Sequence, residues 1–338
     1  MGKKRYTAGI QRVKGLLQVA SALYDSSLSF ETTRAAEGVL QTGSRLGRAL
    51  RLSLAAGKDS KNISLSFATG GLREITALAD GKFSLIWMNP SAMLTMAYRG
   101  TGPFRKRLPL RTIWVFPSYD IVAFAVHEST GIASLAQIKK DRIPLRLSTG
   151  PITSRLLREN ATMITVTAVM RAAGFTLADI RKWKGRVQPL PGPSYPERRE
   201  AIESGAVNAI FDEGIKSWGQ TAVDCGFRFL PVEGKILKRM VTLGYRPAVM
   251  SKARFPGIFE DVQTLDFSGW PMAVRADMLE EVAYALCEAI ERSKDAIPTD
   301  NFKPLDLAQL CANDEEAPCD VPLHPGAVRF YRERGFLK

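Results

Sequence analysis

Residues 62–79 read NISLSFATGGLREITALA and contain the pattern that decides the fold class. Residues 62–68 form a β-like run, and residues 72–79 follow with the spacing of a helix. Gly70 and Gly71 lie between them, where a tight turn needs residues without a Cβ atom. The stretch therefore predicts a strand, a turn and a helix in succession.

The alternation of strand and helix continues on both sides of this stretch. The predicted strands are 28–32, 62–68, 83–88, 112–116, 121–126, 145–148, 187–190 and 209–211. The predicted helices are 42–55, 72–79, 91–98, 162–173, 197–204 and 278–294. Leu46, Leu50 and Leu54 support the first helix because they recur at i, i+4 and i+8. This α/β alternation is typical of parallel sheets covered by helices, with ligand sites at the carboxyl ends of the strands.

The length and composition narrow the class of protein. The chain has 338 residues, which favours two compact units of ordinary domain size. Hydrophobic residues make up 45%, charged residues 24%, and the mean hydropathy is -0.08. These values, without any long uninterrupted apolar run, exclude disordered, collagen-like and integral membrane proteins.

The predicted helix at 278–294 comes after both predicted units in the chain. It must pack on a unit that is already formed, and we expect this to be the first unit.

The charge is strongly basic. The formal net charge is +13 and the sequence pI is near 9.7. This balance favours anionic partners, namely nucleic acid, an acidic membrane surface or small carboxylates. The basic residues are not interleaved with aromatic ones along one segment, so no nucleic-acid partner is predicted.

The N-terminus has a basic leader. Five basic residues precede the first acid, Asp25, and they are Lys3, Lys4, Arg5, Arg12 and Lys14. Residues 15–22, GLLQVASA, then end in the Ala-x-Ala pattern of a secretory signal. Gln18 and the preceding basic residues shorten the apolar centre, so an amphipathic N-terminal helix fits as well. If the segment is a leader, residues 1–23 lie outside the fold.

Few residues suggest metal or catalytic chemistry. The four cysteines form no CxxC pair, and the chain has only two histidines, His127 and His324, so no metal site is predicted. The Rossmann, Walker and nucleophile-elbow motifs are absent, and no cofactor and no catalytic residue are predicted. Cys311 and Cys319 bracket an acidic loop, and both a disulfide and two free thiols remain open.

Polar residues that follow predicted strands are the candidates for ligand binding. They are Thr69, Gly70 and Gly71; Asn89; Tyr119; Asn160 and Thr162; and Asp212 and Glu213. Backbone N–H groups and hydroxyls at a helix start can receive an anion, and an acid at a strand end can receive an ammonium group. Helix capping and ordinary turn formation explain the same residues without a ligand.

Three further stretches resemble a known family. Residues 68–74 (ATGGLRE), 98–104 (YRGTGPF) and 322–331 (PLHPGAVRFY) are similar to the TAXI family of substrate-binding proteins, which serve TRAP-type secondary transporters. Residues 131–138, 206–211 and 274–277 look similar as well. The likeness runs from about the first predicted strand to the C-terminus.

The resemblance implies a two-lobed fold of the type II periplasmic-binding class, with a small ligand in a cleft between the lobes. Lobe one is then 24–125 with 250–338, and lobe two is 126–249, with hinges near 124–127 and 245–275. The family's ligand loops correspond to 31–38, with Thr33 and Arg34, and to the turn that begins at Thr149.

The predicted function follows from the resemblance. We expect a periplasmic solute-binding protein, not an enzyme, that captures a small anionic metabolite for the membrane subunits of a TRAP transporter. The ligand is expected to be a carboxylate, either an organic acid or an amino acid. A cytoplasmic ligand sensor or an enzyme on the same fold is the alternative, because a fold does not fix a function.

Overall fold

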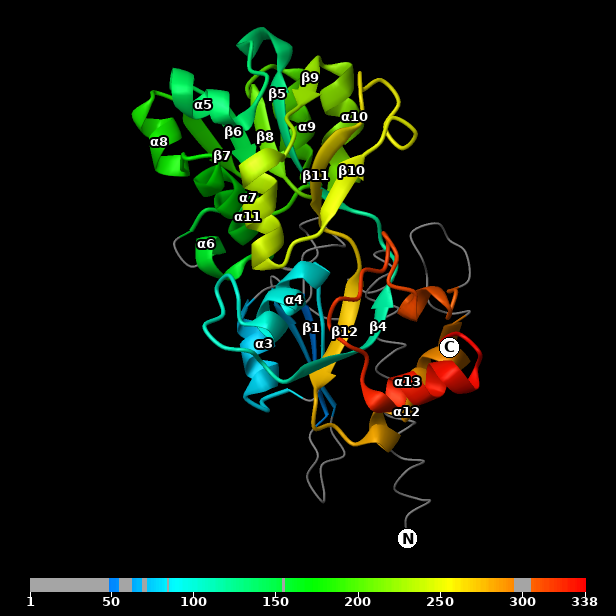
Figure 1. Cartoon of the computed structure of the whole chain (residues 1–338). Coiled ribbons are helices and arrows are strands. Elements are labelled where there is room, and N and C mark those ends of the chain that lie inside the picture. The colour runs from blue at the N-terminus through cyan, green and yellow to red at the C-terminus, as the bar shows by residue number, and fades with distance from the viewer. Residues whose placement is uncertain (1–48, 55–62, 69–71, 84, 154–155, 295–304) are drawn as a thin grey trace. The chain divides into compact units, whose positions relative to one another are not determined.

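The computed structural model describes residues 49–54, 63–68, 72–83, 85–153, 156–294 and 305–338 (Figure 1). These residues divide into two compact units. Unit 1 contains the described residues of 48–119 and 268–338, and unit 2 contains 120–267. Each unit has its own sheet and helices, so the predicted α/β fold class with two lobes is confirmed. The lobe boundaries at 125 and 249 and the cleft between the lobes stay predictions.

The sheet of unit 1 combines five strands from distant parts of the chain. Their order is β2 (Ile63–Ala68), β1 (Ala49–Leu54), β3 (Leu85–Trp87), β12 (Trp270–Arg275) and β4 (Leu110–Phe116). Each neighbouring pair is antiparallel, so β2, β3 and β4 run in one direction while β1 and β12 run in the other between them. The sequence predicted parallel neighbours because it did not show the two inserted strands.

The predicted helix at 42–55 is wrong over its second half. Residues 49–54 form β1, which pairs with β2 and β3. Their sequence, ALRLSL, also alternates Leu50, Leu52 and Leu54 with polar residues, which is the period of a strand. Leucines at i and i+4 lie on one face of a helix and also on one face of a strand. Pairing with β2 and β3 selects the strand.

The helices of unit 1 flank this sheet. They are α3 (Leu72–Ala79), α4 (Ser91–Arg99), α12 (Glu280–Ser293) and α13 (Pro325–Glu333), with a 3-10 turn at Gln309–Cys311. Ile75 of α3 and Met93 of α4 are fully buried in the core. The ring centroids of Tyr284 in α12 and Phe330 in α13 lie 5.5 Å apart, edge to face. The late helix α12 falls in unit 1, and the predicted division into lobes stays a prediction. Cys311 and Cys319 are free thiols.

Unit 2 has a seven-stranded mixed sheet. Its order is β10 (Pro247–Met250), β11 (Val262–Asp266), β5 (Ile121–His127), β8 (Ala209–Asp212), β6 (Arg146–Thr149) and β7 (Arg186–Pro189), and β9 (Phe227–Phe229) also pairs with β5. β6 is parallel to both β7 and β8, and the other pairs are antiparallel. The three parallel strands are those that the alternation with helices predicted.

The helices of unit 2 include those predicted at 162–173 and 197–204. They are α5 (Leu135–Asp141), α6 (Leu156–Glu159), α7 (Ala161–Ala172), α8 (Leu177–Lys182), α9 (Pro196–Glu203), α10 (Ile215–Asp224) and α11 (Gly234–Leu243), with a 3-10 turn at Glu128–Thr130. Phe124 of β5 and Phe211 of β8 are buried with ring centroids 5.1 Å apart, which ties neighbouring strands together.

The chain passes between the units at residues 119–120 and 267–268. Residues 124–127 instead lie inside β5, where they pair with β8 and β9. The hinges predicted near 124–127 and 245–275 stay predictions. Among the described helices, none combines the length and apolar character needed to cross a membrane.

Candidate functional site

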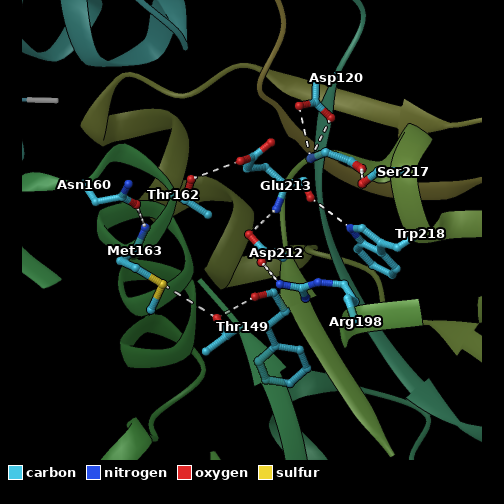
Figure 2. Close-up of polar contacts among 12 residues, drawn as sticks. Asp120, Thr149, Asn160, Thr162, Met163, Arg198, Asp212, Glu213, Ser217 and Trp218 are labelled. Atoms are coloured by element: carbon cyan, nitrogen blue, oxygen red, sulfur yellow. Dashed lines mark hydrogen bonds and ion pairs between the residues drawn. The ribbon is translucent and has the colours of Figure 1, made fainter. Parts of the chain in front are cut away.

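The carboxyl ends of β6, β7 and β8 lie at one edge of the unit 2 sheet. The parallel pairing of β6 with both neighbours places Thr149, Pro189 and Asp212 at this edge. β5 is antiparallel to β8, so Asp120, which precedes β5, joins the same edge. This edge, together with the start of α7, brings together five of the predicted site residues (Figure 2): Thr149, Asn160, Thr162, Asp212 and Glu213.

Asp212 forms a buried ion pair with Arg198 of α9. Nη2 of Arg198 donates to Oδ2 of Asp212, and both side chains are 1% exposed. The backbone N–H of Glu213 donates to Oδ1 of Asp212 at 2.9 Å. Burial raises the pKa of Asp212, while the charge of Arg198 opposes that rise. Asp212 therefore has a cationic partner within the protein, and the predicted role of receiving a ligand's ammonium group does not suit it.

Arg198 has unused hydrogen-bonding capacity. Its Nε and Nη1 atoms are buried and have no hydrogen-bond partner among the described residues. The hydroxyls of Ser148 in β6 and Ser194 in the turn before α9 are also buried and have no hydrogen-bond partner among the described residues. Buried donors without partners cost about 1–3 kcal/mol each. The edge therefore offers donors that an anion or ordered water would satisfy.

Asp120 connects the start of β5 to the turn between β8 and α10 through hydrogen bonds. Oδ1 accepts the backbone N–H of Ile121 at 2.8 Å, of Gly214 at 3.0 Å and of Ile215 at 3.3 Å. Gly214 has φ 68°, and a Cβ atom there would lie 2.4 Å from Cγ of Pro193, so the turn requires glycine. Burial raises the pKa of Asp120 to about 6, although the hydrogen bonds to Glu213 and the backbone oppose the rise.

Asp120, Asp212 and Glu213 form an acidic trio, and Glu213 is the member whose surroundings favour the protonated form most clearly. Burial, the negative charges of Asp120 and Asp212, and a hydrogen bond to Asp120 together raise its pKa well above the ordinary value. The hydroxyl of Thr162 donates to Oε1 at 3.4 Å. Oε2 receives no N–H or O–H donor from the described residues, as is expected of a carboxyl that is itself the donor.

The other predicted residues in this group have structural bonds. Oγ1 of Thr149 donates to the backbone oxygen of Phe211 at 2.7 Å and so joins β6 to β8. Oδ1 of Asn160 accepts the N–H of Met163 at 3.0 Å and caps α7, as its position before a helix suggested. Thr162, in the first turn of α7, is the group from this helix that reaches the acidic trio.

The remaining predicted site residues lie elsewhere. Asn89 is in unit 1, in the turn between β3 and α4, where Nδ2 donates to the backbone oxygen of Gly269 at 3.0 Å. Tyr119 is the last residue of the first segment of unit 1 and is buried. Thr33, Arg34, Thr69, Gly70 and Gly71 lie outside the described residues.

Sequence reasoning missed Asp120 and Arg198. Arg198 stood out only as part of a basic cluster, yet its position three and four residues before Ala201 and Ile202 puts it on the buried face of α9. An arginine on an apolar helix face requires an anionic partner, and that was the available signal. Asp120 precedes a strand predicted correctly, but nothing local connects it with Gly214.

A separate cavity of about 640 Å³ lies on another part of unit 2. Phe227, Phe229, Ile258 and the exposed Phe259 line it, with Arg228 at its wall. None of the predicted site residues lines this cavity. Among the described residues, no group of three or more histidine, cysteine and acidic side chains is arranged to hold a metal ion.

Solved structures of binding proteins are similar to this chain at low identity. A TctC solute-binding protein from Polaromonas is 11% identical with a TM-score of 0.38, covering 78% of this chain and 80% of that one. The periplasmic binding protein BugD is 15% identical with a TM-score of 0.36, covering 80% and 86%. Tv2483 bound to L-arginine is 12% identical with a TM-score of 0.31, covering 72% of each chain. These values are too low to carry an argument about function.

A family model matches most of the chain. The model of the NMT1-like family matches residues 40–335, which include both units and the whole acidic trio. The chain therefore belongs to the NMT1-like family.

Proposed function

We propose that the chain is an extracytoplasmic solute-binding protein that captures a small organic acid or amino acid and delivers it to a TRAP-type transporter. It performs no turnover. The TAXI-like stretches at 98–104 and 322–331 support the transporter class, and the basic leader with its Ala-x-Ala ending supports export.

One observation carries the binding function. At the carboxyl edge of the unit 2 sheet, Arg198 has two nitrogen atoms that find no hydrogen-bond partner among the described residues, and a buried acidic trio lies beside them. A ligand carboxylate supplies the acceptors that these nitrogens lack, and charge-assisted bonds of this kind are among the stronger ones. The carboxyl ends of parallel strands are where α/β proteins bind ligands.

A thermal-shift panel of dicarboxylates, keto acids and amino acids tests the proposal. A ligand at about 100 times its Kd adds about 2.7 kcal/mol of stability, which raises the melting temperature measurably. Arg198→Lys retains the charge with fewer donors and should weaken carboxylate binding, whereas Arg199→Lys on the exposed side of α9 should not. If only neutral or purely cationic compounds stabilise the chain, the proposal is wrong.

Export and delivery need separate measurements. Mass spectrometry of the protein from its native host should find a terminus near residue 23 in the extracytoplasmic fraction. Deleting the gene should abolish uptake of the stabilising compound. An intact Met1 or Gly2 on cytoplasmic protein would favour the ligand-sensor alternative.

A further inference from the structure

The members of the acidic trio differ in what each one accepts. Asp120 accepts three backbone N–H groups, and Asp212 accepts Arg198 and one backbone N–H. Among the described residues, the hydroxyl of Thr162 donates to Oε1 of Glu213 at 3.4 Å, and the buried carboxyl of Glu213 also shares a hydrogen bond with Asp120. No N–H or O–H group of the described residues donates to Oε2 of Glu213 (Figure 2), so an incoming donor would replace the proton of the carboxyl.

The charges that face Glu213 come from four elements. Asp120 at the start of β5 and Asp212 at the end of β8 are negative, and Arg198 of α9 is positive but pairs with Asp212. Lys216 of α10 acts on Asp120. With Glu213 neutral, the charges of Arg198 and Asp212 offset each other, and Lys216 opposes the negative charge of Asp120. A cation at Oε2 of Glu213 would interact favourably with the negative charge of Asp120.

We propose that Glu213 receives the amino group of the ligand and releases its own proton to solvent when that group binds. The carboxyl O–H bond breaks, the carboxylate forms a charge-assisted bond with the ammonium group, and one proton leaves for each ligand bound. This inference rests on the proposed solute-binding function and narrows the solute to amino-acid-like compounds, with Arg198 facing the carboxylate and Glu213 the ammonium.

Burial gives this arrangement its selectivity. A charge pair enclosed by protein is stronger than the same pair in water, so an ammonium group that reaches Glu213 gains more than it would at a surface. A compound without an amino group leaves the proton in place and gains nothing there. Because the proton is a product of binding, the affinity for the amine should rise by up to about tenfold per pH unit below the pKa of Glu213.

Pairs of probes that differ only at the amino group test the proposal on the full chain. L-glutamate with 2-oxoglutarate and L-aspartate with oxaloacetate serve as the pairs, in thermal-shift and calorimetric titrations at pH 6 and pH 8. We expect the amino acid of a pair to bind at least about tenfold more tightly at pH 8, where the discrimination corresponds to about 1.4 kcal/mol. Titration in two buffers of different ionisation enthalpy should show about one proton released per amino acid bound and none for the keto acid.

Glu213→Gln retains the size of the side chain and an acceptor for Thr162. It should remove the proton release and the preference for the amino acid, with the keto acid still bound. Glu203→Gln, an exposed change at the end of α9, is the matched control and should alter neither. In the infrared, the wild type should show a protonated-carboxyl band that Glu213→Gln lacks.

The outcomes separate the two proposals. Equal affinities within each pair without proton release would overturn the role of Glu213 and leave solute binding standing. Stabilisation by no compound of the carboxylate panel would overturn the proposed function itself. If Glu213→Gln does not fold, proton release by the wild type decides, and the absence of the infrared band from the wild type contradicts the inference without any ligand.

Discussion

Two strand-to-helix turns, one in each unit, illustrate different ways to bury polar groups. In unit 1, Asn89 follows β3 and its amide closes the turn with a bond to the backbone of Gly269. In unit 2, Asp212 ends β8 and Glu213 follows it, and both carboxyls are buried. The amide bonds to a neutral backbone oxygen, whereas Asp212 is stabilised by Arg198 and a backbone N–H group, and the surroundings of Glu213 raise its pKa.

The difference implies that the first turn contributes to stability at every pH and the second does not. A neutral hydrogen bond has no proton to gain or lose near neutrality, but a buried carboxyl with a raised pKa couples folding to pH. Local sequence looks alike in the two places, since each is a polar residue after an apolar strand. The surroundings decide which turn can respond to a ligand or a proton.

Removing Arg198 should have the largest effect. Arg198→Met leaves Asp212 buried without its cation, and breaking such a pair by removing one partner costs about 3–5 kcal/mol. Urea unfolding at pH 7 should show the loss, and Arg199→Met, a change at the neighbouring exposed residue, should cost little. Adding Asp212→Asn to Arg198→Met should restore part of the stability. If the double variant is no more stable than Arg198→Met, Arg198 does not stabilise the fold through its ion pair with Asp212.

Asp120 should make stability fall as pH rises. Its pKa is about 6 in the folded chain against an ordinary 3.8, so the folded state binds more protons between these values. The stabilising contribution is full below about pH 4 and is lost as pH passes about 6, by at most about 3 kcal/mol. Unfolding free energies measured from pH 4 to pH 8 should show this slope, and Asp120→Asn should reduce it, with the contributions of Asp212 and Glu213 remaining. An unchanged slope in the variant would place the titration elsewhere.

Loss of the Asn89 amide should have the smallest effect. Asn89→Ala removes the buried bond from Nδ2 to the oxygen of Gly269, and should cost about 1–3 kcal/mol. The deficit should be equal at pH 5 and pH 8, since no titrating group is altered. If the loss of unfolding free energy in Asn89→Ala instead changes with pH as the contribution of Asp120 does, the two turns do not differ in their pH dependence.

Much of the fold could be predicted where the determining contacts are local. The helices at Leu72–Ala79, Ser91–Arg99 and Ala161–Ala172 match their predicted ranges closely, because periodicity and capping act within a few residues. The strands β1 and β12 were not predicted. β12 pairs with β3 and β4, which lie far before it in the chain, and such pairing leaves little mark on the local sequence. β1 does alternate like a strand, but the leucine spacing there also fits the predicted helix.

The candidate site was predicted in part. Thr162, Asp212 and Glu213 come together as polar residues at strand ends and a helix start should. Asp120 and Arg198 were missed, because their importance depends on partners 94 and 14 residues away in the chain.

The α/β class, a size that fits two units, the basic charge and the positions of the polar turns could all be predicted from the sequence alone. These depend on composition and short-range periodicity, which a linear chain carries. Tertiary packing is what pairs Asp212 with a cation, bonds Asp120 to the β8–α10 turn and raises the pKa of Glu213. Whether a carboxyl is charged depends on burial and on neighbouring charges, and both arise only when distant segments pack together.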